Sequence, residues 1–111
     1  SRKYGALLFI DIDNFKTIND SIGHYAGDIL LKAIGLRFKE NVRDSDTVAR
    51  LGGDEFIILL EELSRDLVEA ANQSRAFGEK LIQLLQESFV IDKHEHYSSP
   101  SIGITLFHDD S

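Results

Sequence analysis

The sequence contains no cysteine, no methionine and no tryptophan among its 111 residues, and it has a single proline. Without cysteine the chain forms no disulfide, no thiolate metal site and no cysteine nucleophile, so thiol redox chemistry is excluded. The scarcity of proline, together with 42% hydrophobic residues, excludes a disordered or collagen-like chain. The sequence predicts one folded domain, because 111 residues leave no room for two separate cores.

Long hydrophobic runs and an excess of positive charge are also missing. The longest apolar stretches, 6–10 and 56–60, have the length of a strand and fall short of a membrane span. Against 19 Asp and Glu there are only 12 Lys and Arg, and the net charge is −7. We therefore expect a cytoplasmic domain that contacts neither nucleic acid nor membrane. The start at Ser1 without Met indicates a piece of a longer protein, and a membrane anchor elsewhere in that protein is compatible with this expectation.

Three strand-like segments lie in the first sixty residues. Residues 6–12 form a continuous apolar run that ends in acid, which predicts a buried central strand with Asp11 at its end. Residues 46–51 and 55–60 predict a hairpin, because the turn 52–54 begins with two glycines that adopt positive φ at little cost.

The rest of the chain is predicted to be mainly helical, because its apolar residues recur at spacings of three and four. The remaining predicted elements are a short helix at 17–21, a helix at 26–40, a helix at 67–85 capped by Ser64, and a last pair of strands at 89–91 and 101–107 with Pro100 at a strand entrance or edge. This order is that of a split β-α-β unit, an α/β (α+β) domain with a mixed, mainly antiparallel sheet and helices on one or both faces.

Three acidic residues are predicted to meet although they lie far apart in the sequence. In the usual order of a split unit the first strand lies beside the hairpin, which places Asp11 next to Asp54 and Glu55. Such carboxylates do not all stay ionised without a cation, and oxygen ligands suit Mg²⁺ or Mn²⁺. Because Mg²⁺ keeps positions for water and phosphates, the cluster indicates nucleotide chemistry. The polar segment after the first strand supplies candidate substrate contacts, namely Lys16, Asn19, His24 and Asp28.

Other motif interpretations fail on spacing. The segment after the first strand begins like an EF-hand loop, but Phe15, Lys16 and Ile22 stand where a ligand, a glycine and the closing Glu are needed. No Walker or dinucleotide-binding motif occurs. His94 and His96 read as a solvated turn, because two ligands on a mobile loop make a poor metal site.

Three segments together resemble the GGDEF domains, the diguanylate cyclases of bacterial second-messenger signalling. They are FIDIDNFKTINDSIGHYAGD at 9–28, RDSDTVARLGGDEF at 43–56 and SIGITLF at 101–107. The resemblance implies a nucleotide-cyclase or palm-like fold and the condensation of two GTP into cyclic di-GMP with release of two pyrophosphates. It further implies a catalytic homodimer in which each domain holds one GTP.

The resemblance also implies a role for each matching residue. Asp11 and Asp54 would bind the metal through their carboxylates, and Ile12 through its carbonyl. Asp54 is the candidate acceptor of the 3′-hydroxyl proton, with Glu55 as the neighbouring signature acid, and Lys16 would stabilise the transition state. The residues implied in substrate binding are Asn14, Phe15, Asn19, His24, Asp28 and Gly53, with Asn19 and Asp28 on the guanine edge.

Residues 43–46 fit the RxxD inhibitory motif of this family. There the Arg43 guanidinium would donate two hydrogen bonds to phosphate or guanine acceptors of cyclic di-GMP, and the Asp46 carboxylate would accept hydrogen bonds from guanine N–H groups. Arg75 is a further candidate contact on the second long helix. The opening and closing segments of the family pattern fall outside the sequence, which predicts a larger protein with linked sensor or EAL domains.

Two alternatives to the cyclase stay open. The first is a non-catalytic module that binds GTP and regulates a neighbouring EAL phosphodiesterase domain. The second is a cyclic di-GMP receptor that works through Arg43 and Asp46 alone. The cyclase is favoured over the first alternative by the intact residues Asp11, Lys16, Asn19, Asp54 and Glu55.

Overall fold

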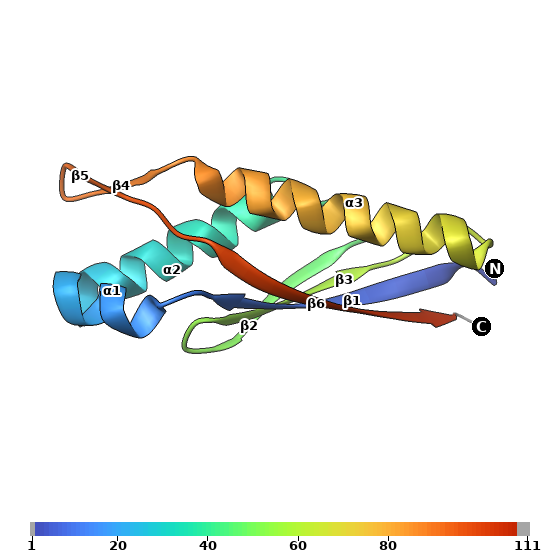
Figure 1. The fold of residues 1–111 in the computed structure, drawn as a ribbon, viewed down its shortest axis with the longest axis horizontal. Helices are drawn as coiled ribbons and strands as arrows, with labels where there is room; N and C mark the ends of the chain where they lie inside the picture. The colour runs from blue at the N-terminus through green and yellow to red at the C-terminus, as the bar shows by residue number, and fades with distance from the viewer. Residues whose placement is uncertain (1, 109–111) are drawn as a thin grey trace.

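A computed structural model describes residues 2–108, which form a four-stranded sheet, a small separate hairpin and three helices (Figure 1). In chain order the elements are β1 (Tyr4–Ile12), α1 (Phe15–Ile22), α2 (His24–Lys39), β2 (Thr47–Gly52), β3 (Glu55–Leu60), α3 (Leu67–Gln86), β4 (Phe89–Ile91), β5 (His94–His96) and β6 (Pro100–His108). The sheet has the order β2-β3-β1-β6, and each neighbouring pair in it is antiparallel. The predicted α+β class and the pairing of the first strand with the hairpin are confirmed.

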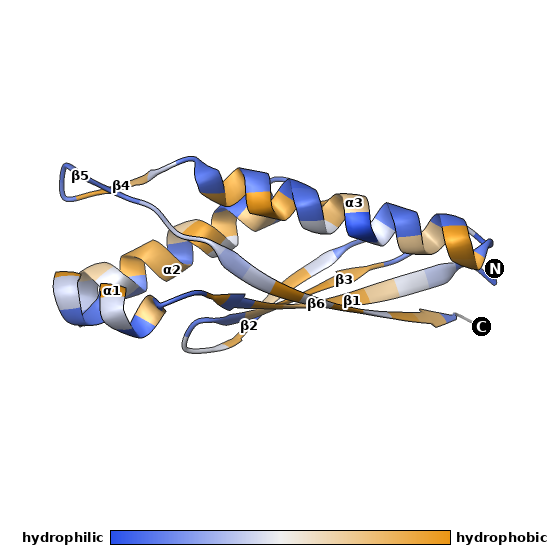
Figure 2. Cartoon of the chain, viewed as in Figure 1, coloured by the Kyte–Doolittle hydropathy of each residue, from blue (hydrophilic) through white to orange (hydrophobic). Residues whose placement is uncertain are grey.

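Strand β1 is central, and its alternate residues point to opposite sides of the sheet. Leu8, Ile10 and Ile12 are at most 2% exposed and belong to the main core. Both long helices cover this side of the sheet. Gly35 of α2 packs against Phe56, which is the cross-strand partner of the buried Ile10. Figure 1 shows α3 on the same side. In Figure 2, hydrophobic residues run along β1, and hydrophobic and hydrophilic residues alternate along α3.

Glycine separates the first two helices. Gly23 has φ 90°, ends α1 with an N–H bond to the Asn19 carbonyl, and lets α2 begin at His24. Helix α2 thus starts two residues earlier than predicted, and α1 is longer than 17–21. Asn14 also has a positive φ, 55°, at the turn from β1 into α1. Two sharp turns therefore bring the polar segment back over the end of the sheet.

Two details of the predicted elements are wrong. The N-cap of α3 is Asp66, whose carboxylate accepts the Glu69 N–H at 2.9 Å, while Ser64 only accepts the Asp66 N–H. The predicted pairing of 89–91 with 101–107 is also wrong: β4 pairs with β5, and β6 pairs with β1. The reason is the tight turn 92–93, in which both residues have positive φ and fold the chain straight back.

Arg37 ties α2 to the C-terminal end of α3. Its guanidinium donates to the carbonyls of Leu84, Glu87 and Ser88 at 2.7 to 3.0 Å and lies 3.5 Å from the centre of the Phe89 ring. These bonds satisfy carbonyls that the end of a helix leaves free. The contact fixes where α3 ends and β4 begins.

Candidate functional site

Asp11 and Asp54 meet where β1 ends, as predicted. The register pairs the Cα of Asp11 with that of Glu55, and the Ile12 N–H donates to the Asp54 carbonyl at 3.1 Å. Burial, followed by the charge and a hydrogen bond of Asp54, raises the pKa of Asp11. Because the Ile12 side chain is buried, only its backbone can serve a ligand. Asp54 opposes the ionisation of Asp11, and two neighbouring carboxylates form a donor set that suits a divalent cation.

The third acid does not complete a cluster. Within residues 2–108 no group of three or more acidic, histidine or cysteine side chains is arranged to hold a metal. The charges that raise the pKa of Asp11 are those of Asp54 and Asp13, whereas Glu55 is exposed at the start of β3. Glu55 is the Cα partner of Asp11, as predicted, but the three carboxylates do not form a group that could hold a metal. The candidate ligand set is therefore the pair Asp11 and Asp54, which still suits Mg²⁺ because that ion commonly uses one or two carboxylates.

Two serines that the sequence analysis missed hold the nearby Asp13. The Ser99 hydroxyl donates to one oxygen of this carboxylate at 2.9 Å, and the Ser101 hydroxyl donates to the other. Both serines flank Pro100, the Cα partner of Ile12 at the start of β6. These bonds fasten the end of β1 to the edge strand and so fix the backbone next to the acidic pair.

A cavity of about 210 Å³ gathers most of the predicted substrate residues. Asn19 donates through its side-chain amide to Nδ1 of His24 at 2.7 Å. The lining residues are Phe15, Asn19, His24, Asp28, Leu31, Arg50 and Gly53. Asn14 stands at the start of α1, and Lys16 is exposed in its first turn, where backbone N–H groups lack helical partners.

Gly27 sets the position of Asn19. A Cβ at Gly27 would lie 2.0 Å from the Asn19 side-chain oxygen, so the amide occupies the space that a glycine leaves on α2. Gly27 was not singled out from the sequence, and the pattern offers only a small residue within an amphipathic helix as a signal. The absence of its side chain brings α1 and α2 together at the cavity.

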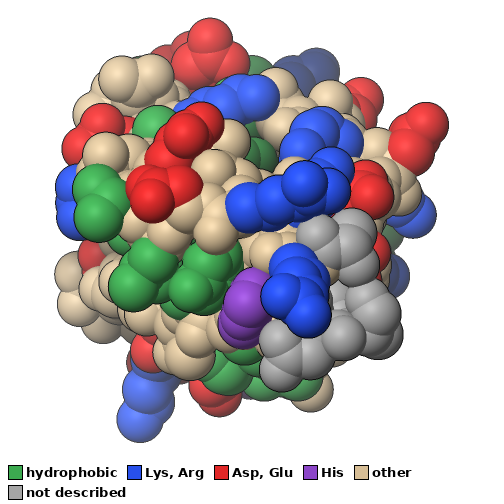
Figure 3. All heavy atoms as spheres, turned by 90° about the vertical axis from the view of Figure 1, so that its right-hand side faces the viewer, with side chains coloured by type: hydrophobic (Ala, Val, Ile, Leu, Met, Phe, Trp, Pro, Cys, Tyr) green, Lys and Arg blue, Asp and Glu red, His purple; other side chains and the backbone are tan. Residues whose placement is uncertain are grey.

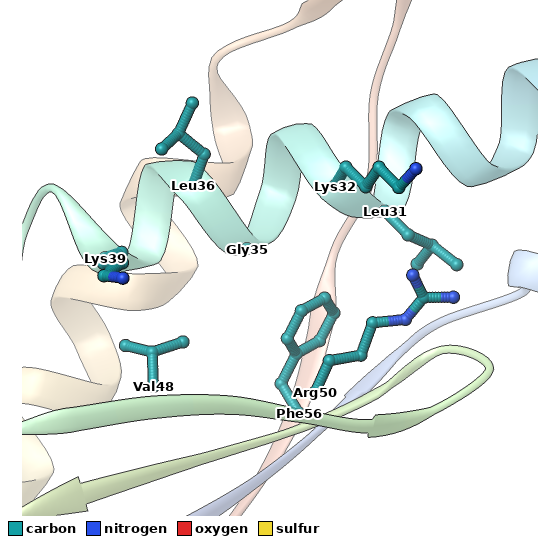
Figure 4. A pocket seen from close by; sticks show the side chains of 8 residues that line it. All are labelled: Leu31, Lys32, Gly35, Leu36, Lys39, Val48, Arg50 and Phe56. Carbon is teal, nitrogen blue, oxygen red and sulfur yellow. The ribbon is translucent and has the colours of Figure 1, made fainter.

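Arg50, like Leu31, lines this cavity and was not singled out from the sequence. Its Nε donates to the Gly53 carbonyl at 3.0 Å, and its Nη1 lies 3.5 Å from Oδ1 of Asp28. Lys32 lies 3.1 Å from the second oxygen of Asp28. The hydrogen bond from Lys32 has the largest effect on the pKa of Asp28 and lowers it; burial raises it by less, and Arg50 adds a smaller lowering. Arg50 and Leu31 also line an apolar groove of about 340 Å³ between α2 and β2 (Figure 4).

The RxxD segment forms a closed ion pair. Arg43 donates through Nε and Nη2 to the two oxygens of Asp46 at 3.1 and 3.0 Å, and it also donates to the Glu61 carbonyl. The Asp46 side chain is 2% exposed. Burial raises the pKa of Asp46, but the hydrogen bonds from Arg43 and the Glu61 N–H outweigh burial and leave it below its usual range. This pair braces the start of β2 against the end of β3.

Cavities of about 270 Å³ flank Arg43 on both sides. Gln73, Phe77 and Lys80 of α3 line one of them. Arg75 does not; it bonds Asn72 on its own helix at 3.1 Å. The RxxD segment 43–46 lies before β2, and the signature turn lies after it. The RxxD segment and the turn are therefore separated by the length of a six-residue strand, about 20 Å.

Comparison with known proteins decides the family. The model of the family described as "Diguanylate cyclase, GGDEF domain" matches residues 1–111. The chain belongs to the GGDEF domain family. This GGDEF domain is 45% identical, over 95% of its length, to the bifunctional diguanylate cyclase/cyclic di-GMP phosphodiesterase MucR of Pseudomonas aeruginosa. It is 44% identical, over 96% of its length, to the diguanylate cyclase TpbB of the same organism.

Solved structures agree with this assignment. The GGDEF domain of TpbB from Pseudomonas aeruginosa superposes with a TM-score of 0.86 at 40% identity, over 95% of this chain and 63% of that one. An EAL/GGDEF domain protein from M. capsulatus gives 0.81 at 42% identity, over 94% and 64%. The chain spans only 14% of MucR and 23% of TpbB. In the described part of the chain, none of the helices has the length and apolar character that crossing a membrane requires.

Proposed function

We propose that this GGDEF domain is a diguanylate cyclase that condenses two GTP into cyclic di-GMP and releases two pyrophosphates. The observation that carries the proposal is the Asp11–Asp54 pair beside the signature turn, whose Gly53 also lines the cavity of Asn19 and Asp28. A cation-binding pair beside a polar cavity is the arrangement that phosphoryl transfer needs.

The acidic pair would hold Mg²⁺ or Mn²⁺. Asp11 and Asp54 would contribute carboxylate oxygens, and Ile12 its carbonyl. When bound, the ion neutralises phosphate charge. The raised pKa of Asp11 supports this assignment, because it marks charges that lack compensation in the protein alone. Loss of either carboxylate would remove half of the protein's acidic ligands.

The remaining residues bind and orient the nucleotide. Asn19 and Asp28 present hydrogen-bonding groups to a guanine edge, and His24 holds the Asn19 amide. The first-turn N–H groups of α1, from Asn14 through Phe15, would face the phosphates, with Lys16 stabilising negative charge in the transition state. Asp54 would take the proton of the attacking 3′-hydroxyl, with Glu55 beside it.

The reaction joins two nucleotides, so it requires two copies of the domain facing each other. Each copy would hold one GTP and present its α-phosphate to the 3′-hydroxyl of the other. A homodimer is therefore the proposed active unit, inside a longer bacterial protein with linked sensor or EAL domains. Specific activity should rise with protein concentration until the dimer is saturated.

Turnover of the intact protein with GTP and Mg²⁺ tests the proposal. Cyclic di-GMP should form, Asp54→Ala should abolish it, and Asp92→Asn in the β4–β5 turn should leave it unchanged. GTP that binds without forming product would support the non-catalytic regulatory module instead. No binding of GTP at all would contradict both.

A second function, binding of cyclic di-GMP at Arg43, is favoured by the two cavities that flank this residue. Because Asp46 occupies the guanidinium fork, the product would have to compete with an internal ion pair. Arg43→Ala should weaken product binding and relieve inhibition while turnover persists. Product binding that does not change in this variant would reject the inhibitory site. A protein that binds cyclic di-GMP but makes none would be a receptor.

A further inference from the structure

Arg50 is the residue that joins the two halves of the candidate site. It lies near the end of β2, and its side chain rises beside Phe56 toward Leu31 of α2 (Figure 4). From there it contacts the Gly53 carbonyl at 3.0 Å and Asp28 at 3.5 Å. One side chain therefore links the signature turn to the carboxylate on α2.

The two cations near Asp28 differ in how firmly they are held. The Lys32 side chain is 71% exposed and makes an i,i+4 pair on one helix, which leaves it free to move. The Arg50 side chain is 33% exposed, and its second bond to the turn fixes the plane of the guanidinium. Lys32 has the larger effect on the pKa of Asp28, but only Arg50 can define where that carboxylate points.

The direction of the carboxylate decides what base it recognises. Guanine presents two adjacent donors, N1–H and the 2-amino group, which match the two oxygens of one carboxylate. Each oxygen of Asp28 has one cation beside it and retains lone pairs for these donors. A base without the 2-amino group leaves one oxygen unpaired, which lowers its affinity only if the carboxylate is held in place.

We infer that Arg50 is a specificity-determining positioning residue, which orients Asp28 so that the site selects a purine nucleotide with a 2-amino group. The inference rests on the proposed function, because it assumes that the cavity takes the base of GTP. The same guanidinium holds the turn that carries Asp54, so base recognition and the acidic pair share one support.

The test compares GTP with inosine triphosphate, which lacks only the 2-amino group. In the intact protein, the ratio of kcat/KM for GTP to that for inosine triphosphate should fall about tenfold in Arg50→Lys, because lysine cannot contact the turn and Asp28 together. Lys32→Gln, the matched control on the mobile cation, should change the ratio less than twofold. An unchanged ratio in a folded Arg50→Lys variant would overturn the inference.

A double-mutant cycle separates positioning from general destabilisation. In an Asp28→Asn background, Arg50→Lys should cause no further loss of selectivity. An equal loss in both backgrounds would mean that Arg50 acts only through stability, which would reject its role in specificity.

Calorimetric titration without divalent cation distinguishes failure of this inference from failure of the cyclase proposal. If no product forms but GTP binds more tightly than inosine triphosphate, and Arg50→Lys removes the difference, the role of Arg50 holds and the cyclase does not. If product forms but both nucleotides bind equally, the cyclase stands and the inference fails. Absence of product together with no binding of either nucleotide, with or without Mg²⁺, would overturn both.

Discussion

Asp11 is the residue whose surroundings most disfavour its charge. Burial and Asp54 raise its pKa above the ordinary 3.8, so the folded state binds this proton more tightly than the unfolded state. Protonated Asp11 therefore makes its full contribution to the free energy of unfolding below pH 3.8, and this contribution is lost as the pH rises through the raised pKa. At neutral pH the charge on Asp11 therefore opposes folding, and a bound cation would compensate it.

We expect Asp11→Asn to raise the melting temperature at neutral pH without divalent cation and to abolish the gain from Mg²⁺. Wild-type protein should gain about 1.4 kcal/mol at ten times the dissociation constant for the ion. Calorimetry with and without Mg²⁺ measures both effects, and Asp20→Asn on the exposed side of α1 is the control. A Mg²⁺-dependent gain that survives in Asp11→Asn would contradict the assignment of the pair.

Gly27 acts on the site rather than on the fold. Gly27→Ala should push the Asn19 amide aside, because the added Cβ would lie 2.0 Å from its oxygen, and GTP affinity should fall about tenfold with the loss of that contact. Gly78→Ala on α3 is the control, since its Cβ would meet Ile104 at an ordinary 3.5 Å. This control should keep GTP affinity and stabilise the chain by up to about 1 kcal/mol. Equal affinities in the two variants would argue against a role for Gly27.

At the scale of elements, helix ends decide how the two long helices pack. Helix α3 has a side-chain cap at its start, Asp66, but its end has neither a glycine nor a cap of its own. Arg37 of α2 supplies what is missing by donating to three carbonyls there. A residue far away in sequence therefore determines where this helix ends.

We expect Arg37→Lys to destabilise the chain by about 1–3 kcal/mol, because a lysine cannot reach three carbonyls and leaves partly buried acceptors unpaired. Amide exchange should accelerate first in the last turn of α3 and in β4. Arg75→Lys on the exposed side of the same helix should stay within about 0.5 kcal/mol. Equal stability of the two variants would show that the Arg37 contacts contribute little.

At the scale of the whole molecule, both long helices, α2 and α3, lie on the same side of the sheet (Figure 1). Among the described residues, Phe9 is 46% and Phe107 is 37% exposed, and the register places Phe9 beside Gly103 and Phe107 beside Gly5 on the other side. The end that carries the termini instead mixes acidic, basic and apolar side chains (Figure 3). Exposed apolar residues on an uncovered sheet face favour contact with other surfaces.

The chain of 111 residues should therefore bind a hydrophobic dye and self-associate at high concentration. Phe9→Thr should reduce dye fluorescence and association while keeping the strand, since threonine also suits a sheet. Val90→Thr, at an exposed position of the β4 strand, should reduce neither, because Val90 lies outside the four-stranded sheet. Dye binding that is equal in both variants would show that the sheet does not expose an apolar surface.

The sequence by itself determined the family and most of the elements, although His94 and His96, interpreted as a solvated turn, lie in β5. The apolar run before Asp11 predicted a central strand, and the turn at Gly52-Gly53 predicted the hairpin, because local periodicity and backbone freedom suffice for both. The pairing of the last strands was wrong because local pattern does not choose a partner: two positive-φ residues at 92–93 turned β4 back on β5, and β6 joined β1.

Only the tertiary structure decided which side chains meet. Register across β1 and β3 sets Asp11 opposite Glu55, and the neighbouring Asp54 is the residue whose charge and hydrogen bond act on the Asp11 carboxyl. Packing of α2 over the hairpin brings Arg50 to Asp28, although neither residue carries a local signal for the other. Such contacts depend on the relative position of whole elements in space, and that position is set by the shared core rather than by any single stretch of sequence.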